Sequence, residues 1–473
     1  MVFEVMDPIH GRLSFPDLVR DIVDTELFQR LRRIKQLGLV SLVFPGAVHD
    51  RFLHSLGTAA LAQRLVLSLQ ARGADVDARD VLCVTIAALC HDLGHVCYGH
   101  TFEVFMRQEG SKAWRHETAS VELLRRIFAE QLRPGRLSEF GLGDRDARFI
   151  EELIDPPKRW LRTASARKRL NDATWASRVR GRPFAKAWLY EIVSNWRSGV
   201  DVDKFDYLRR DAYYLGIPER FDHDAYINTV AIGRDESGTS TLAPPITFAK
   251  ELRAMFDLRK RLHEECYQCM RVKRAEAHMI SILSRARKAL GASLEDATDG
   301  TLQRLTDVFV DASLTGPLDE AMSEAIEEYR RRFSLRRQMF FLGETAHLGV
   351  TPSDVLRAYD DRGELAGDLT GDFTAGELTG NETWRSVEER EIVGIFVESS
   401  RGLGAVDPMS KIIFHTNDSS LPGLQGLHLI PDAPEQVLTR RRLFFWDVPE
   451  RDDATRERLR RALDAAVAMV AEA

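Results

Sequence analysis

Cysteine is scarce in this sequence, and its scarcity limits the chemistry and the compartment that suit the chain. Five cysteines occur among 473 residues, a small odd number that argues against a disulfide framework and favours a reducing cytoplasm. Cys266 and Cys269 form one CxxC pair, but a zinc site made from such pairs needs a second one. We therefore read both as ordinary helix residues and expect no thiolate metal site.

Long apolar runs and an excess of positive charge are also absent. No stretch reaches the roughly 18 apolar residues that a transmembrane helix needs. The N-terminal sequence MVFEVMDPIHGRL lacks the basic and apolar regions of a signal peptide. The formal net charge is −6, whereas proteins that coat nucleic acid are usually basic. We expect a soluble, cytoplasmic protein without a membrane partner, for which nucleic acid is disfavoured but a small anionic substrate is not.

The most informative stretch lies at residues 90–100, CHDLGHVCYGH. It follows an apolar run over residues 81–89 that predicts a buried helix. Imidazole and carboxylate groups suit Fe, Mn, Zn, Ni or Mg as metal ligands. Because His91 and Asp92 would point about 100° apart on a helix, other segments must bring the remaining ligands.

The first candidate for a missing ligand is His54, within an apolar helical pattern that begins near Arg51. Its neighbours Arg51 and Gly57 are unusual choices for a helix that only packs. Taken alone, His54 is better explained as a buried histidine bonded to a backbone carbonyl.

Two later segments place polar side chains in rows at helical spacing. The row in residues 199–211 consists of Asp203, Lys204, Tyr207 and Asp211. The row in residues 248–290 consists of Arg259, His263 and Tyr267. Arginine binds phosphate in bidentate fashion, and a tyrosine ring can wall a sugar. When each row is considered alone, a solvated helix face is the commoner explanation for the first row and the preferred explanation for the second.

The hydrophobic pattern predicts a large helical body followed by a smaller lobe. Helical periodicity covers residues 18–37, 51–69, 113–132, 248–290 and 301–337. After a stretch rich in Gly, Thr and Asp over residues 360–381, short β-rich runs occur at residues 392–397, 412–415 and 443–446, and a helix is predicted at 453–471. We expect a mainly α protein, with a helical domain at 1–345 and an α+β lobe at 346–473 packed on it.

The candidates together form the pattern H…HD…D, which is that of the HD-domain phosphohydrolases; its members are His54, His91, Asp92 and Asp203. Surrounding blocks narrow the resemblance, namely residues 30–38, 43–47, 51–57, 91–95, 114–117 and 200–207. They resemble the deoxynucleoside triphosphate triphosphohydrolases of the vertebrate SAM-and-HD-domain type and their bacterial relatives. The resemblance is dense over residues 3–290 and weaker to the end, and it begins almost at the HD body, without a SAM domain.

The resemblance implies a role for each matching residue. The metal ligands would be His54, His91, Asp92 and Asp203, and the catalytic group would be His95, His116 and Glu103. Glu103 stands where the family has an aspartate. The substrate contacts would be Gln36, Leu37, Arg51, His100, Lys204, Tyr207, Asp211, Arg259, Tyr267 and Gln268. A regulatory nucleotide site would use Asp24, Gln29 and Arg32, although Met6 and Glu264-Glu265 depart from the family pattern around it.

These roles imply a metal-dependent phosphohydrolase that converts a dNTP to a deoxynucleoside and inorganic triphosphate, for control of dNTP pools or defence against phage. We expect one divalent transition metal per chain (Fe, Mn, Zn or Ni), with Mg as a further candidate that enters with the nucleotide. A homo-oligomer, dimer or tetramer, and an activating dNTP or GTP are the expected partners. Two alternatives stay open: an HD-type nuclease or phosphodiesterase, and an oligomeric nucleotide-sensing protein.

Overall fold

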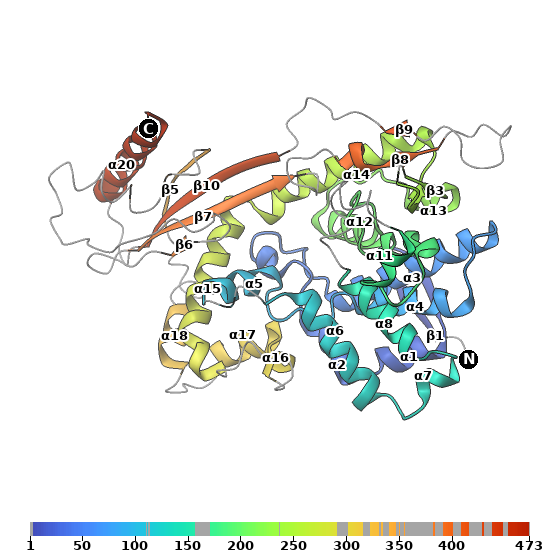
Figure 1. Cartoon of the computed structure of the whole chain (residues 1–473). Helices are drawn as coiled ribbons and strands as arrows, with labels where there is room; N and C mark the ends of the chain where they lie inside the picture. Colours follow the sequence, from blue (N-terminus) through green and yellow to red (C-terminus); the bar gives the residue numbers. More distant parts are fainter. Residues whose placement is uncertain are drawn as a thin grey trace.

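The computed structural model describes residues 3–109, 111, 114–156, 171–235, 237–290, 301–315, 322–330, 333, 340–346, 350, 354, 382–383, 391–400, 408–415, 428–429, 438–447 and 453–472. Helices predominate among them (Figure 1), so the mainly α prediction is confirmed. The predicted Gly-, Thr- and Asp-rich stretch at 360–381 lies outside the described residues. Within the described part of the chain, no helix is both long and apolar enough to span a bilayer.

The core of the helical body is a pair of long helices, α3 (Arg51–Ala71) and α4 (Ala78–Cys90), which pack on each other. Helix α8 (Asp144–Ile154) packs on α4, and α12 (Val202–Leu215) packs on α3. The predicted buried helix is confirmed, because every residue from Leu82 to Cys90 is buried. The end of α4 therefore delivers residues 91–95 into the interior of the protein.

The helix predicted over residues 18–37 is wrong as a single element. The structure has α1 (Asp17–Val23), α2 (Glu26–Gln29) and a 3-10 turn over Arg30–Arg33. The reason lies in the Thr25 side chain, which accepts a hydrogen bond from Phe28 N and so starts a new helix in the middle of the apolar pattern. Before α1, strands β1 (Phe3–Asp7) and β2 (Gly11–Phe15) form an antiparallel hairpin.

Other predicted helices are present but interrupted. Helix α6 (His116–Arg126) continues as a π turn over Ile127–Gln131. Residues 248–290 form α14 (Ala249–Leu262), a π turn over His263–Tyr267 and α15 (Met270–Leu290). The described part of 301–337 contains α16 (Thr301–Arg304), α17 (Asp307–Thr315) and α18 (Ser323–Tyr329). Among the described residues, this body also contains the α-helices and strands α5 (His100–Gln108), α7 (Arg136–Glu139), α11 (Asp172–Ala176), α13 (His223–Thr229), β3 (Ala231–Arg234) and β4 (Ser240–Ala243).

The C-terminal part contains an antiparallel sheet of order β5-β10-β7-β6. Its strands are β5 (Phe340–Thr345), β6 (Glu382–Thr383), β7 (Glu391–Ser400) and β10 (Leu438–Asp447), and α20 (Asp453–Glu472) packs on β5. Strand β8 (Ile413–Phe414) pairs with β9 (His428–Leu429). The predicted strands and closing helix are confirmed, and β7 runs beside α14 and α15 (Figure 1). The division at residue 345 stays a prediction, and β5 belongs to this sheet although it precedes that boundary.

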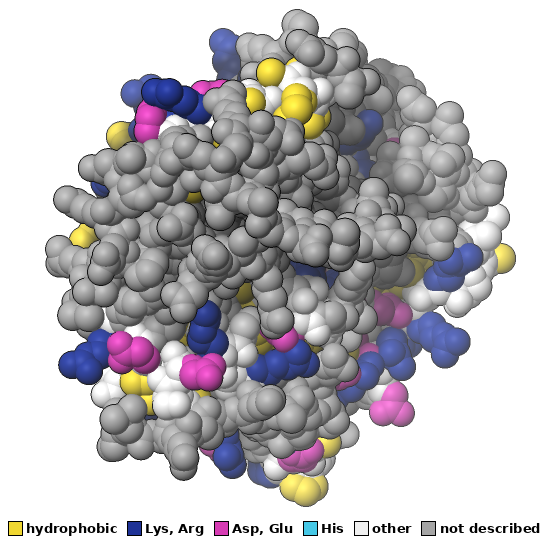
Figure 2. All heavy atoms as spheres, turned by 90° about the vertical axis from the view of Figure 1, so that its left-hand side faces the viewer, with side chains coloured by type: hydrophobic (Ala, Val, Ile, Leu, Met, Phe, Trp, Pro, Cys, Tyr) yellow, Lys and Arg dark blue, Asp and Glu magenta, His cyan; other side chains and the backbone are white. Residues whose placement is uncertain are grey.

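The surface charge is mixed on the face that Figure 2 shows. On the face in Figure 2, Lys and Arg side chains of described residues lie interspersed with Asp and Glu rather than in a field of one sign. This distribution fits the modest net charge of −6.

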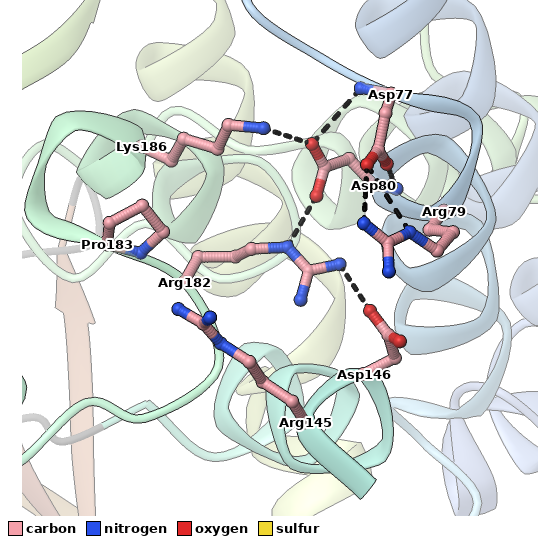
Figure 3. A pocket seen from close by; sticks show the side chains of 8 residues that line it. All are labelled: Asp77, Arg79, Asp80, Arg145, Asp146, Arg182, Pro183 and Lys186. Carbon is pink, nitrogen blue, oxygen red and sulfur yellow. Dashed lines mark hydrogen bonds and ion pairs between the residues drawn. The ribbon is translucent and has the colours of Figure 1, made fainter. Parts of the chain in front are cut away.

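A buried ion-pair network anchors the end of α4 that is opposite the His-Asp stretch. It surrounds a cavity of about 240 Å³ (Figure 3), lined by Asp77, Arg79, Asp80, Arg145, Asp146, Arg182, Pro183 and Lys186. Asp80 accepts from Arg182 Nε at 2.5 Å and from Lys186 Nζ at 2.6 Å, and Arg182 Nη2 reaches Asp146 at 2.7 Å. The network ties α4 to α8 and to the segment that follows α11.

Replacing Asp80 by alanine should strongly destabilise the fold. Asp80 is 1% exposed, so Asp80→Ala leaves two cations facing a buried gap, and breaking such a pair costs about 3–5 kcal/mol. The free energy of unfolding measured in urea checks this. The matched control is Asp75→Ala, because the Asp75 side chain is 95% exposed at 4.0 Å from Lys186. Equal stability of the two variants would contradict a structural role for the network.

Candidate functional site

The four predicted metal ligands meet at the junction of α3, α4 and α12. His54 Nε2 lies 3.3 Å from His91 Nε2 and 3.2 Å from Asp203 Oδ1. His91 Nε2 lies 3.4 Å from Asp203 Oδ1 and 3.5 Å from Asp92 Oδ1. His91 and Asp92 are positioned because α4 ends at Cys90 and the chain turns, with His95 N bonded to Asp92 O.

The Nδ1 atom of each ligand histidine makes a hydrogen bond that fixes the orientation of the ring. His54 Nδ1 donates to Asp206 Oδ2 at 2.7 Å, and His91 Nδ1 donates to Ala88 O at 2.8 Å. Both Nε2 atoms are therefore left to face the same space, as metal-binding histidines usually do.

Asp206 belongs to a buried network that sequence reasoning missed. It also accepts from His10 Nε2 at 2.7 Å and from Arg210 at 2.8 and 2.9 Å. Arg210 in turn donates to Asp7 at 2.9 Å, so the hairpin β1–β2 contacts the carboxylate that orients His54. The available signal was the i, i+4 spacing of Asp206 and Arg210, three residues beyond Asp203.

The glycine at position 57 allows α12 to pack closely against α3. A Cβ atom at Gly57 would lie 1.9 Å from Asp206 Oδ1 and 2.5 Å from Arg210 Nη2. A side chain here would push α12 away from α3, and with it Asp203 and Asp206. The unusual glycine in an apolar helix therefore has a structural cause.

The electrostatic field at this site favours a cation. Burial alone would lower the pKa of His54, but hydrogen bonds to Asp203 and Asp206 and the nearby charge of Asp92 raise it to about 10. Burial would raise the pKa of Asp203, but His54 and His91 outweigh it and hold that pKa below its usual range. The donor atoms of His54, His91 and Asp203 all lie within 4.8 Å of one another and fit one divalent metal ion. Asp92 is not part of this set, although its Oδ1 lies 3.5 Å from His91 Nε2.

The predicted catalytic group lies directly beside this set. The rings of His95 and His116 stack at 4.0 Å with a 17° angle, and His95 Nε2 lies 3.5 Å from Asp92 Oδ1. His116 Nδ1 donates to Glu103 Oε1 at 2.5 Å, so the longer glutamate reaches the histidine. The side chain of His100 is 73% exposed and lies 3.5 Å from Glu103.

The environments of the two stacked histidines push their pKa values apart. Burial, Arg51 and His116 hold the pKa of His95 well below its usual range. Burial would also lower the pKa of His116, but the hydrogen bond and charge of Glu103 raise it. Such divergence is typical of acid–base pairs.

The predicted substrate residues lie on elements around these groups. Arg51 donates to Asp92 Oδ2 and, at 3.3 Å, to the backbone oxygen of Gln36, the neighbour of Leu37. Lys204 Nζ lies 3.1 Å from Asp201 Oδ2. Burial raises the pKa of Tyr207, and Arg259 from α14 is the largest opposing influence.

The two polar rows predicted from helical spacing meet in space. Tyr267 Oη donates to Asp211 Oδ2 at 2.5 Å, and His49 Nε2 donates to Asp211 Oδ1 at 2.7 Å. Gln268 Nε2 donates to His263 Nδ1 at 3.1 Å across the π turn. Tyr267 ends this turn, and π turns often mark functional sites.

The residues predicted for a regulatory nucleotide are close together on the surface. Arg32 Nε donates to Gln29 Oε1 at 2.8 Å, and Gln29 Nε2 donates to Val23 O at 2.8 Å. Asp24 is exposed and ends α1. Met6 is 70% exposed. The regulatory role stays a prediction.

Comparison with known proteins first defines a class. Residues 51–168 match the HD domain family. His54, His91 and Asp92 lie inside this range, and Asp203 lies beyond it. Residues 51–168 are therefore similar to an HD domain, the class of protein to which the predicted metal-ligand pattern belongs.

Similarity to individual proteins points to a narrower group within this class. The chain is 38% identical over 278 residues to mouse (Mus musculus) deoxynucleoside triphosphate triphosphohydrolase SAMHD1. The aligned region covers 55% of this chain and 41% of that protein. Identity to the human protein is 39% over 269 residues, covering 56% and 41%. Identity to the Dictyostelium discoideum homolog is 38% over 218 residues, covering 45% and 36%. The chain spans about 41% of the mouse and human proteins and is related to these triphosphohydrolases, as the sequence resemblance indicated.

The contact between α3 and α12 should govern metal affinity. Gly57→Ala places a methyl group against Asp206, and disturbing a partner that orients a ligand typically costs about 10–100-fold in metal affinity. Metal titration of the purified protein measures the change, with Asp203→Ala as the reference for full loss. Gly143→Ala is the matched control, because a Cβ there meets nothing within 4 Å. Unchanged affinity in Gly57→Ala would contradict this coupling.

Proposed function

We propose that this chain is a metal-dependent dNTP triphosphohydrolase that releases a deoxynucleoside and inorganic triphosphate. One observation carries the proposal: Asp92 Oδ1 lies 3.5 Å from Nε2 of both His91 and His95. A single carboxylate therefore joins the metal-ligand set to the stacked acid–base pair. The activity for which the similar proteins are named supplies the substrate class.

The residues around this carboxylate have distinct tasks in the proposed reaction. A divalent metal, when bound by His54, His91, Asp92 and Asp203, would supply charge to polarise a phosphoryl group and acidify bound water. Arg51, Lys204 and Arg259 provide cations for the triphosphate. His116, whose pKa Glu103 raises, suits donation of a proton to the leaving 5′ oxygen, and neutral His95 suits acceptance of one.

The sugar and base would lie toward the second group of residues. Its members are Gln36, Leu37, His100, Tyr207, Asp211, Tyr267 and Gln268. The metal is one of Fe, Mn, Zn or Ni in this proposal, because the donors are nitrogen and oxygen. A homo-oligomer activated by a dNTP or GTP at Asp24, Gln29 and Arg32, a cytoplasmic location, and a role in dNTP pool control or phage defence complete the proposal.

Product analysis tests the reaction. The purified protein, loaded with each candidate metal, is incubated with each dNTP alone and in mixtures, and products are separated by chromatography. Deoxynucleoside plus triphosphate in equal amounts is expected. Mononucleotides from single strands, or hydrolysis of cyclic nucleotides without dNTP turnover, would favour the phosphodiesterase alternative. Nucleotide binding without turnover would favour the sensing protein.

Tyr267 should select against ribonucleotides. Its ring is fixed by the bond to Asp211, and a sugar packed on it has no partner for a 2′-hydroxyl. An unpaired buried hydroxyl costs about 1–3 kcal/mol, roughly 5- to 150-fold in kcat/KM. Tyr267→Ala should narrow the preference for dGTP over GTP, whereas Tyr267→Phe, which keeps the ring but loses the hydrogen bond to Asp211, should retain more of it.

The measurement is kcat/KM for dGTP and GTP on the three proteins, with any activating nucleotide held constant. Equal use of the two substrates by the wild-type protein would reject the role of Tyr267 as a sugar wall.

A further inference from the structure

Helix α17 contacts two segments of the proposed active site through one buried side chain. Asp307, its first residue, is 3% exposed. Its two carboxylate oxygens accept backbone hydrogen bonds from two separate segments, Oδ1 from Tyr98 N at 2.6 Å and Oδ2 from Lys35 N at 2.9 Å. A single carboxylate thereby joins segments that are far apart in the sequence.

Both segments carry residues of the proposed active site. Residues 35–38 include Gln36 and Leu37, and residues 95–100 include His95 and His100. The segments touch closely, because a Cβ at Gly38 would lie 2.7 Å from Tyr98 O. A small movement of one segment against the other would therefore shift sugar or base contacts relative to the catalytic histidines.

The second segment also has a backbone that needs support. Tyr98 has φ of +57°, a conformation that residues other than glycine seldom adopt and that persists when its surroundings hold it. The support comes from one short stretch beyond α15. Besides the bond to Asp307, Tyr98 Oη donates to Asp311 Oδ1 at 2.7 Å, and Cys97 N donates to Leu305 O at 2.8 Å.

We propose that Asp307 is a positioning residue that clamps residues 35–38 to residues 95–100 and so sets the geometry between nucleotide and catalytic histidines. The inference rests on the proposed function and deepens it. The two hydrogen bonds described for the Asp307 side chain both go to backbone N–H groups, so Asp307 acts through the two segments.

The ionisation of Asp307 gives the clamp a measurable signature. Burial raises the pKa of Asp307 to about 6, although the hydrogen bonds from Tyr98 and Lys35 oppose the rise. The charged or titratable groups that interact with it are Lys35, Cys97, Tyr98 and Asp311. A protonated carboxyl group exchanges one acceptor for a donor, so the full clamp exists above this pKa and is lost as pH falls through it.

The test compares wild type with Asp307→Asn, which also lacks one acceptor. At pH values well above 6, kcat/KM for a dNTP should fall by about 10–100-fold, the usual effect of misplaced reacting groups. Metal content should be unchanged. As pH falls between about 8 and 5, the ratio of wild-type to variant kcat/KM should approach one. Protonation of the substrate phosphates cancels in this ratio.

Asp311→Asn is the matched control, because its amide oxygen can still accept from the Tyr98 hydroxyl. At pH values well above 6 it should retain wild-type kcat/KM. Because the charge of Asp311 helps to raise the pKa of Asp307, the loss of activity at low pH should begin at a lower pH in this variant than in wild type. A ratio near one for Asp307→Asn at all pH values, an equal loss in Asp311→Asn, or loss of metal in Asp307→Asn would overturn the proposal. If Asp307→Asn does not fold, Gly38→Ala should give the same metal-retaining loss by pushing on Tyr98, and wild-type activity in that variant would overturn it.

Amide hydrogen exchange separates this inference from the proposed function. Faster exchange in the peptides that contain Lys35 and Tyr98 is expected in Asp307→Asn and not in Asp311→Asn. If the wild-type protein does not hydrolyse dNTPs, the proposed function fails and the clamp is judged on exchange alone. Unchanged exchange in both peptides would reject the clamp.

Discussion

The contact of α3 with α12 through Gly57 is the constraint on which the site depends. It brings a buried carboxylate, Asp206, within 2.7 Å of His54 Nδ1. A carboxylate with no exposure needs full compensation, and Asp206 has it from Arg210, His10 and His54. Removing one member would leave charge uncompensated in the interior, so the network holds α3, α12 and the hairpin β1–β2 in one arrangement.

This arrangement explains why the metal ligands come from separate helices. The end of α4 supplies only His91 and Asp92, so the other ligands of the same ion must come from other helices. Rigid packing of α4 between α3 and α8 brings these two residues to His54 and Asp203. The ion pairs of Asp80 and Arg182 fix the opposite end of α4, so the helix has little freedom to shift along its axis.

The metal ligands could be predicted from the sequence because packing alone does not explain histidine and aspartate at these positions. His91 and Asp92 follow a wholly apolar run, and their partners recur in recognisable blocks. It did not predict Asp206 or Asp307, since an aspartate at either position is equally common on a solvated helix face. Their roles depend on contacts with residues far along the chain, and only the folded arrangement reveals them. The break of the helix predicted over 18–37 has a local cause, the Thr25 cap. The prediction relied on helical periodicity alone and gave this cap no weight.

The two ends of the proposed pocket differ in how firmly they are held. The metal end is built on long packed helices. Asp206, the Ala88 carbonyl and Arg51 are further partners of His54, His91 and Asp92, respectively. The nucleotide end is made of a π turn at Tyr267, the segment around Gln36 and the loop at Tyr98. Hydrogen bonds from other segments hold these parts, such as Tyr267 with Asp211 and Asp307 with the backbone at Tyr98. Loops and turns generally tolerate more change than packed helices. If the proposed function holds, helix packing fixes the metal end, whereas the choice of nucleotide depends on hydrogen bonds between segments.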